Sequence, residues 1–247
     1  MGNKSEVTKA NTVILIPTYN EAPNIERQLH ALAEFRATRS ASNTFDVIVI
    51  DDKSPDNTAG LVKDLQFPWV RIESPSEKAG LGNAYKHGFA IAMRESYEFV
   101  VEMDADGSHR IEDLAAILDA DTKFDLVIGS RWIKGGRVEN WSLPRRVLSR
   151  CGNIYSKMLL RFPVNDSTSG YRRISTSVLR KLDLQTIASA GYGFQIEMAF
   201  SIYKAGGTII EVPICFVERI AGYSKMSSGI AREAIVNITK LALRSSR

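Results

Sequence analysis

Short β-branched runs alternate with longer segments of helical periodicity, and this alternation constrains the fold more than any other feature of the chain. The runs that we interpret as strands are Val13–Ile16, Asp46–Ile50, Val70–Ile72, Phe99–Met103 and Asp125–Ile128. The segments between them that we interpret as helices include Asn24–Phe35, Leu81–Met93 and Glu112–Leu118. Strands joined by helices in this order are typical of a parallel sheet. The sequence therefore predicts an α/β fold with a mostly parallel central sheet flanked by helices.

Length and composition favour one domain over residues 1–247, with residues 1–11 flexible. With 247 residues, 44% of them hydrophobic, the chain can bury one substantial core. Lys and Arg exceed Asp and Glu by 32 to 28, which does not imply a nucleic acid partner but is compatible with an anionic ligand or a membrane surface. Cys151 and Cys215 lack a metal-site spacing, and there is no signal peptide or spanning apolar stretch. We expect a soluble or peripheral protein in a reducing compartment.

Polar residues follow three of the predicted strands, in segments 17–21, 51–56 and 104–106. Parallel strands bring their carboxyl ends to one edge of a sheet, where α/β proteins bind ligands. Some of these residues have a second interpretation as helix caps or turn formers. Capping does not account for Glu21 and the pair Asp51 and Asp52 together, so we expect a binding site at this edge.

The most informative of these segments is Asp104-Ala105-Asp106, which comes directly after the apolar run 99–101. Two carboxylates one residue apart at a strand end can converge on a hard divalent cation such as Mg²⁺, whose remaining ligands are often diphosphate oxygens and water. The alternative is a solvated acidic turn. The pair alone does not decide between the two interpretations.

Two segments carry an apolar stripe at helical spacing beside basic residues. The first is Leu143–Phe162, whose arginines and lysine have no acidic residue among them, and the second is the run 230–243. A basic amphipathic helix can lie in a membrane interface. An apolar stripe is also what any core helix needs. The sequence leaves both alternatives open for each segment.

Seven motifs follow one another as in polyprenol-phosphate mannosyltransferases. They are Pro17–Glu21, Asp51–Asp56, Met103–Asp106, Gly129–Arg131, Thr168–Arg172, Gly193–Glu197 and Glu218–Met226. The chain resembles this family, which includes the dolichol-phosphate mannose synthases and bacterial polyprenol monophosphomannose synthases, from about Thr12 to Arg244. The early motifs are shared across inverting family 2 glycosyltransferases with the Rossmann-like GT-A fold, whereas Glu218–Met226 is the most specific.

The resemblance implies transfer of mannose from GDP-mannose to dolichyl or polyprenyl phosphate, with inversion, to form a polyprenyl β-D-mannosyl phosphate. It implies that Asp104 and Asp106 hold Mg²⁺ or Mn²⁺ against the diphosphate, with Ser108 at the position of a third metal contact. Arg131 and Arg219 would act with the two carboxylates in catalysis. The implied nucleotide-sugar site comprises Pro17, Tyr19, Glu21, Ile50, Asp52, Asp104, Ala105, Asp106, Arg219 and Lys225.

On the acceptor side, the resemblance implies that Arg131, Arg145 and Ser149 hold the lipid phosphate. A phosphate is already an anion, so it attacks without a base, and arginine suits its oxygens. Asp166 has two interpretations, as a turn former or as a residue that orients an arginine. The family also implies a peripheral position on the cytosolic face of a membrane, reached through interfacial helices or through a membrane-anchoring subunit.

Three alternative functions compete with this reaction. Transfer of glucose from UDP-glucose to the same lipid phosphate differs only in a few pocket contacts. A non-catalytic subunit that binds the lipid carrier would have lost a metal carboxylate or a phosphate arginine, and none is missing. Dinucleotide binding or nucleotidyl transfer is disfavoured because no Gly-x-Gly-x-x-Gly follows the first strand, and Gly80-Leu-Gly82 lacks that spacing.

Overall fold

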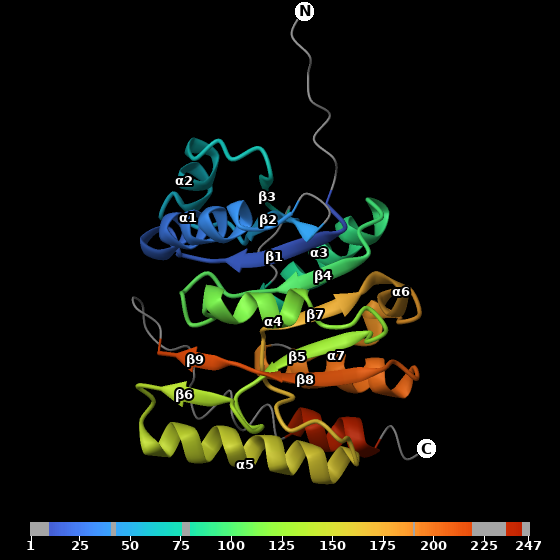
Figure 1. Cartoon of the computed structure of the whole chain (residues 1–247). Helices are drawn as coiled ribbons and strands as arrows, with labels where there is room; N and C mark the ends of the chain where they lie inside the picture. The colour runs from blue at the N-terminus through green and yellow to red at the C-terminus, as the bar shows by residue number, and fades with distance from the viewer. Residues whose placement is uncertain (1–9, 41–42, 76–79, 190, 219–235, 244–247) are drawn as a thin grey trace, which may run out of the picture.

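The computed structural model describes residues 10–40, 43–75, 80–189, 191–218 and 236–243, and its centre is a seven-stranded sheet (Figure 1). The strand order is β3-β2-β1-β4-β7-β5-β8. These strands are β1 Thr12–Thr18, β2 Phe45–Asp51, β3 Val70–Glu73, β4 Phe99–Glu102, β5 Leu126–Ser130, β7 Arg172–Ser175 and β8 Ile209–Pro213. A separate two-stranded sheet pairs β6 Arg137–Glu139 with β9 Cys215–Val217 in parallel.

Strand directions confirm the predicted α/β fold with a mostly parallel sheet. β1 pairs in parallel with β2 and β4, β2 pairs in parallel with β3, and β5 pairs in parallel with β8. β7 is antiparallel to both of its neighbours, β4 and β5. The carboxyl ends of β1, β2 and β4 therefore lie at one edge of the sheet.

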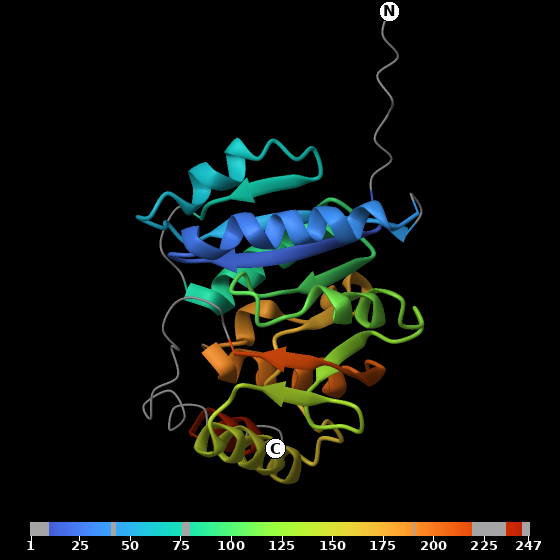
Figure 2. The ribbon, with the colours of Figure 1, turned by 60° about the vertical axis from the view of Figure 1, so that its left-hand side comes forward.

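Helices cover both faces of the sheet because its central strands are apolar on both faces. Val13 and Leu15 of β1 belong to one buried cluster, and Ile14 and Ile16 belong to the other. The first cluster includes side chains of α3 and α7, and the second includes side chains of α1 and α4. Figure 2 shows these helices beside the strands of the sheet. The helices are α1 Ala22–Ala37, α2 Thr58–Asp64, α3 Gly80–Arg94, α4 Leu114–Leu118, α5 Leu143–Leu160, α6 Thr176–Leu179 and α7 Gly191–Lys204, with 3₁₀ turns at Ile111–Asp113 and Leu184–Thr186.

Strand β7 is a feature that the sequence interpretation missed, because two arginines occupy its first two positions. Arg172 and Arg173 are fully or almost fully buried. The Arg172 guanidinium donates hydrogen bonds of 2.6 Å to the carbonyl oxygens of Ser169, Gln195 and Ser167. The Arg173 guanidinium donates to the carbonyl oxygens of Leu118, Ala120 and Asp121. These bonds to backbone carbonyls offset part of the penalty for burying a charge in a sheet.

Helix α5 buries polar residues and exposes most of its large apolar ones, which is the reverse of the usual pattern in a globular fold. Its buried residues are Asn153, Ser156 and Leu160. Its large apolar residues face outward, with Leu143 73% and Met158 74% exposed. Figure 1 shows α5 at the opposite end of the molecule from β3. Most of the predicted stripe is thus exposed, whereas Tyr155 and Phe162 of the same stripe pack in the buried core.

The second amphipathic segment is described only in part. Residues 236–243 are helical, and Ile238 and Ala242 are buried in the same cluster as side chains of α3 and α7. Residues 230–235 of the predicted helix lie outside the described residues, and so do residues 1–9 of the stretch 1–11 for which we predicted flexibility. None of the helices that the structure describes has the length and apolar character needed to cross a bilayer.

Candidate active site

The polar segments that follow β1 and β2 lie beside each other at the carboxyl edge of the sheet. Pro17 pairs with Ile50 and Thr18 pairs with Asp51 in the register of the two strands. The Thr18 hydroxyl donates to Asp51 Oδ1 at 3.0 Å, and the Asp52 N–H donates to the Thr18 carbonyl at 2.9 Å. These bonds hold together the two strand ends that are predicted to line the nucleotide site.

The predicted nucleotide-site residues at these two strand ends differ in their contacts and in their exposure. Asp52 Oδ2 accepts the N–H of Gly80 at 2.9 Å, which ties the second strand end to the first turn of α3. Glu21 accepts a 2.9 Å hydrogen bond from Asn24, and Tyr19 is partly exposed. Ile50 is fully buried in the core, so only its backbone is available to a ligand.

The two carboxylates after β4 are held in different ways. Asp106 is 5% exposed, and its Oδ1 accepts the backbone N–H of Ser108 at 3.0 Å and the Ser108 hydroxyl at 2.6 Å. Gly107 makes this tight turn with a positive φ of 78°. The Asp104 side chain is 39% exposed, whereas Ala105 between them points into the core.

The donor set of this turn fits a hard divalent cation. Its oxygens belong to two carboxylates at a strand end, and oxygen is what Mg²⁺ and Mn²⁺ prefer. Among the residues that the structure describes, no group of three or more His, Cys, Asp or Glu side chains could hold a metal by itself. A cation held by Asp104 and Asp106 would therefore complete its shell with diphosphate oxygens and water. Ser108 already gives its proton to Asp106, and its role as a third ligand stays a prediction.

Motifs distant in the sequence meet around Gly170. A Cβ at this position would lie 3.6 Å from His109 Cε1, 3.7 Å from Gln195 Nε2 and 3.9 Å from Asp104 Oδ1. Burial lowers the pKa of His109 despite the nearby carboxylates, so the imidazole is neutral at neutral pH. The Thr168–Arg172 and Gly193–Glu197 motifs thus lie next to the carboxylate turn.

Arg131 is held by an ion pair that the sequence interpretation left undecided. Its Nε donates to Asp166 Oδ2 at 2.7 Å and its Nη2 donates to Asp166 Oδ1 at 2.6 Å, and both side chains are almost fully buried. The backbone N–H of Arg131 donates to the same Oδ2 at 2.9 Å. Asp166 therefore orients an arginine, which was one of its two interpretations.

Arg131 and Arg145 approach the same indole ring. The guanidinium carbon of Arg145 lies 4.0 Å from the centroid of Trp141, and that of Arg131 lies 5.4 Å from it. Arg145 also forms an ion pair with Glu218, and Ser149 lies one turn further along α5. Arg219 and Lys225 lie outside the described residues.

An aromatic pair connects the arginines to the carboxylate turn. Phe216 of β9 has the guanidinium carbon of Arg131 5.3 Å from its ring centroid and the ring of His109 5.5 Å from it. Neither Trp141, Phe216 nor His109 was identified as a site residue from the sequence. Trp141 stands two residues before the basic helix, but a single tryptophan is no specific signal.

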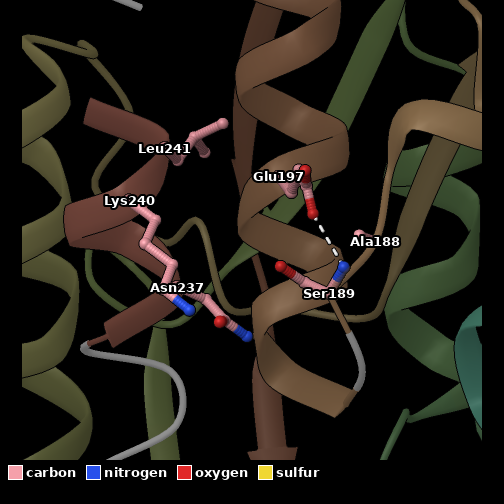
Figure 3. A pocket seen from close by; sticks show the side chains of 6 residues that line it. All are labelled: Ala188, Ser189, Glu197, Asn237, Lys240 and Leu241. Atoms are coloured by element: carbon pink, nitrogen blue, oxygen red, sulfur yellow. Dashed lines mark hydrogen bonds between the residues drawn. The ribbon is translucent and has the colours of Figure 1, made fainter. Parts of the chain in front are cut away.

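A separate pocket of about 140 Å³ lies between α7 and the helical residues 236–243 (Figure 3). The Ser189 N–H donates to Glu197 at 2.9 Å on its wall, while Asn237 and Lys240 reach it from the other side. None of its lining residues belongs to the predicted nucleotide, metal or phosphate sites. The stronger candidate site is therefore the one formed by Asp104, Asp106, Arg131 and Arg145.

Comparison with known proteins supports the same family as the motifs. Residues 13–183 match the model of glycosyl transferase family 2. The chain is 43% identical to undecaprenyl-phosphate mannosyltransferase of Micrococcus luteus over 231 residues, which cover 93% of each chain. It is 42% identical to polyprenol monophosphomannose synthase of Mycolicibacterium smegmatis over 241 residues, covering 94% of this chain and 87% of the relative.

Solved structures show the same fold at much lower identity. Glucosyl-3-phosphoglycerate synthase of Mycobacterium tuberculosis is 18% identical with a TM-score of 0.66, covering 94% of this chain and 80% of the other. A mannosyltransferase of Pyrobaculum calidifontis in complex with GDP-Man and Mn²⁺ is 21% identical with a TM-score of 0.63, covering 96% of this chain and 65% of the other. These similarities agree with the expected GT-A fold. The family model and the two close relatives show that this chain is a glycosyltransferase and belongs to glycosyl transferase family 2.

Proposed function

We propose that this protein transfers mannose from GDP-mannose to the phosphate of a polyprenol or dolichol, with inversion at the anomeric carbon. The names of the two close relatives support a polyprenyl phosphate acceptor and mannose as the sugar. A GDP-Man complex of a protein with the same fold supports the donor. The observation that carries the proposal is the arrangement of two arginines on one indole ring, which Phe216 and His109 connect to the carboxylate turn.

Asp104 and Asp106 would hold the Mg²⁺ or Mn²⁺ ion. Such an ion supplies positive charge to the diphosphate as it leaves, which replaces a general acid. The protein's own part is to present both carboxylates at the strand end, with Asp106 fixed by Ser108. Tyr19, Glu21 and Asp52 line the neighbouring edge, where the guanosine would bind.

The acceptor phosphate would bind at Arg131, Arg145 and Ser149. Asp166 holds Arg131 in one orientation, so the guanidinium is fixed before a phosphate binds. Arg145 is paired with Glu218, whose side chain is 31% exposed, so a phosphate competes with this carboxylate for the arginine. The phosphate is charged at neutral pH, and its oxygen attacks without a base.

The exposed face of α5 is suited to the membrane that contains the lipid acceptor. Its outward apolar side chains lie among basic residues, with no acidic residue between 143 and 161. Apolar contact with acyl chains and attraction to anionic head groups favour an interfacial position. The protein would be peripheral on the cytosolic face of the membrane, with residues 230–243 or a membrane-anchoring subunit as further contacts.

The test is sugar transfer to a short polyprenyl phosphate in the presence of Mn²⁺ or Mg²⁺. Radiolabelled GDP-mannose is compared with UDP-glucose, and a parallel reaction contains EDTA. Metal-dependent product from GDP-mannose alone supports the proposal. Product from UDP-glucose alone overturns the donor assignment, and no product in the presence of liposomes overturns an autonomous catalytic role.

A further inference from the structure

Trp141 is fixed in the fold through its ring. The side chain is 6% exposed, and the ring of Phe216 packs edge-on against it with centroids 5.3 Å apart and an interplanar angle of 75°. The residue lies between β6 and Ser142, the N-cap of α5. Its indole Nε1 is buried and has no hydrogen-bond partner among the described residues. Within that part of the chain, the side chain is therefore held by contacts of its aromatic ring.

The indole ring is a contact surface for Arg145, to which the proposed function assigns the acceptor phosphate. The guanidinium carbon of Arg145 lies 4.0 Å from the centroid of Trp141, a separation that places it over the face of the ring. A cation in this position is attracted by the negative face of the aromatic ring. The contact occupies none of the guanidinium N–H groups, which can still bind phosphate oxygens. Trp141 can therefore hold Arg145 without competing with the ligand.

The two arginines of the proposed phosphate site differ in what holds them. Arg131 is fixed by hydrogen bonds from its guanidinium to the buried carboxylate of Asp166. Over the residues that the structure describes, the guanidinium of Arg145 has an ion pair with Glu218 and the contact with Trp141. The Glu218 carboxylate has to leave Arg145 if a phosphate takes its place. The contact with Trp141 is the one that can persist when the phosphate binds.

We propose that Trp141 is a positioning residue for Arg145, and that its ring keeps the guanidinium at the acceptor phosphate while Glu218 is displaced. This inference rests on the proposed function, in which Arg145 binds the phosphate of a polyprenol. The ring is in place before the lipid arrives, since it packs against Phe216 and lies 5.4 Å from the guanidinium carbon of Arg131. A guanidinium that is already in position loses less conformational entropy when the phosphate binds.

Substitution of the ring separates this role from a loss of folding. Trp141→Phe keeps a smaller aromatic face, whereas Trp141→Leu removes it. Trp69→Leu is the matched control, because the guanidinium carbon of Arg36 lies 5.2 Å from the Trp69 centroid and the ring packs edge-on against Phe45. Trp69 directly precedes β3, at the opposite end of the molecule from α5 (Figure 1).

Two measurements are made on each variant. Binding of geranyl phosphate, a short polyprenyl phosphate, is measured by titration calorimetry, and the KM values for this lipid and for GDP-mannose are measured by transfer with Mn²⁺. We expect Trp141→Leu to weaken binding by roughly 5–20-fold and Trp141→Phe by only about two- to threefold, because phenylalanine keeps a weaker cation–π contact. Trp69→Leu should bind the lipid as the wild type does.

The kinetic constants distinguish positioning from misfolding. The KM for the lipid should rise with the dissociation constant, while the KM for GDP-mannose does not change. A loss of folded protein would instead lower the apparent kcat and leave both KM values unchanged. Equal losses in Trp141→Phe and Trp141→Leu would show that the indole N–H acts rather than the ring face, and would overturn the inference. Wild-type affinity of Trp141→Leu would overturn it as well.

Glu218→Ala tests the same inference without disturbing the buried ring. If Trp141 holds Arg145, removal of the competing carboxylate should strengthen geranyl phosphate binding by roughly two- to fivefold. Weaker binding would mean that Glu218 keeps Arg145 in place, which overturns the inference. A wild-type protein that binds geranyl phosphate but transfers no mannose refutes the proposed reaction and leaves the positioning role to the binding data. A wild-type protein that binds no geranyl phosphate refutes both.

Discussion

Replacing Asp166 by asparagine tests the origin of the Arg131 orientation. The Asp166 oxygens accept three hydrogen bonds from Arg131, and further bonds from Thr168 and Asn153. Asp166 and Arg131 are 0% and 4% exposed, so the substitution leaves a buried guanidinium without its counter-charge. Breaking a buried ion pair in this way typically destabilises a protein by about 3–5 kcal/mol. Asparagine keeps one acceptor oxygen, so we expect a loss of about 3 kcal/mol.

Urea unfolding measures this loss directly. With an m-value of about 3 kcal/mol per M, the midpoint falls by about 1 M. The matched control is Glu139→Gln, which breaks the exposed pair between Arg137 and Glu139 and changes stability by less than about 1 kcal/mol. The double variant Asp166→Asn with Arg131→Met recovers part of the stability, because no unpaired charge remains. A loss below about 1 kcal/mol in the single variant would refute this reasoning.

The ion pair of Asp166 with Arg131 makes the free energy of unfolding depend on pH. Burial opposes ionisation of Asp166, but the charge of Arg131 and the hydrogen bonds outweigh it and hold the pKa below its usual value. The folded state therefore binds this proton less readily than the unfolded state does. The stability contributed by Asp166 is fully present above the unfolded pKa, about 3.9, and is lost as the pH falls through the folded pKa. The difference in unfolding free energy between wild type and Asp166→Asn should shrink at acid pH, and a constant difference would contradict the assignment.

Three further predictions concern the metal, the acceptor and the membrane. Asp106→Ala should abolish metal-dependent transfer without unfolding the protein, while the exposed control Asp64→Ala keeps it; activity of Asp106→Ala that EDTA removes would contradict this role. Glu218→Gln should lower the KM for lipid phosphate by roughly two- to fivefold, because a partly exposed pair with Arg145 competes with the phosphate, and an unchanged KM counts against that competition. Met158→Glu, at a side chain 74% exposed, should lower binding to anionic vesicles by roughly tenfold or more with an unchanged melting temperature, and unchanged vesicle binding would exclude α5 as the contact.

The sequence was sufficient to predict the parts of the fold that depend on local pattern. The strands β1, β2 and β4 are continuous apolar runs because both of their faces are buried, and such runs are visible without tertiary information. β7 was missed because Arg172 and Arg173 are tolerated in a sheet through backbone carbonyls outside the strand, most of them distant in the sequence. No local pattern reports those partners.

The candidate site also has parts that the local sequence predicts and parts that depend on contacts between distant residues. The Asp104 and Asp106 turn could be recognised because its residues are adjacent in the sequence. The pairing of Arg131 with Asp166 spans 35 residues, and the stacking of His109 on Tyr171 joins different elements. For α5, periodicity predicted an apolar stripe but not the face that points outward. That direction depends on the polar partners of the opposite face.

Those polar partners explain how α5 can expose apolar residues and still be fixed to the fold. Asn153 on its buried face donates to Thr168 Oγ1 at 3.0 Å and accepts from Ser167 at 3.1 Å. Thr168 in turn accepts a 2.7 Å hydrogen bond from Arg131. The helix proposed to touch the membrane is thus joined by two hydrogen bonds to an arginine proposed to hold the lipid phosphate. Because the helix also carries Arg145, its depth in the interface would set the height of both arginines above the acyl chains. A polar inner face lets α5 bind this network while its outer face remains available to lipid.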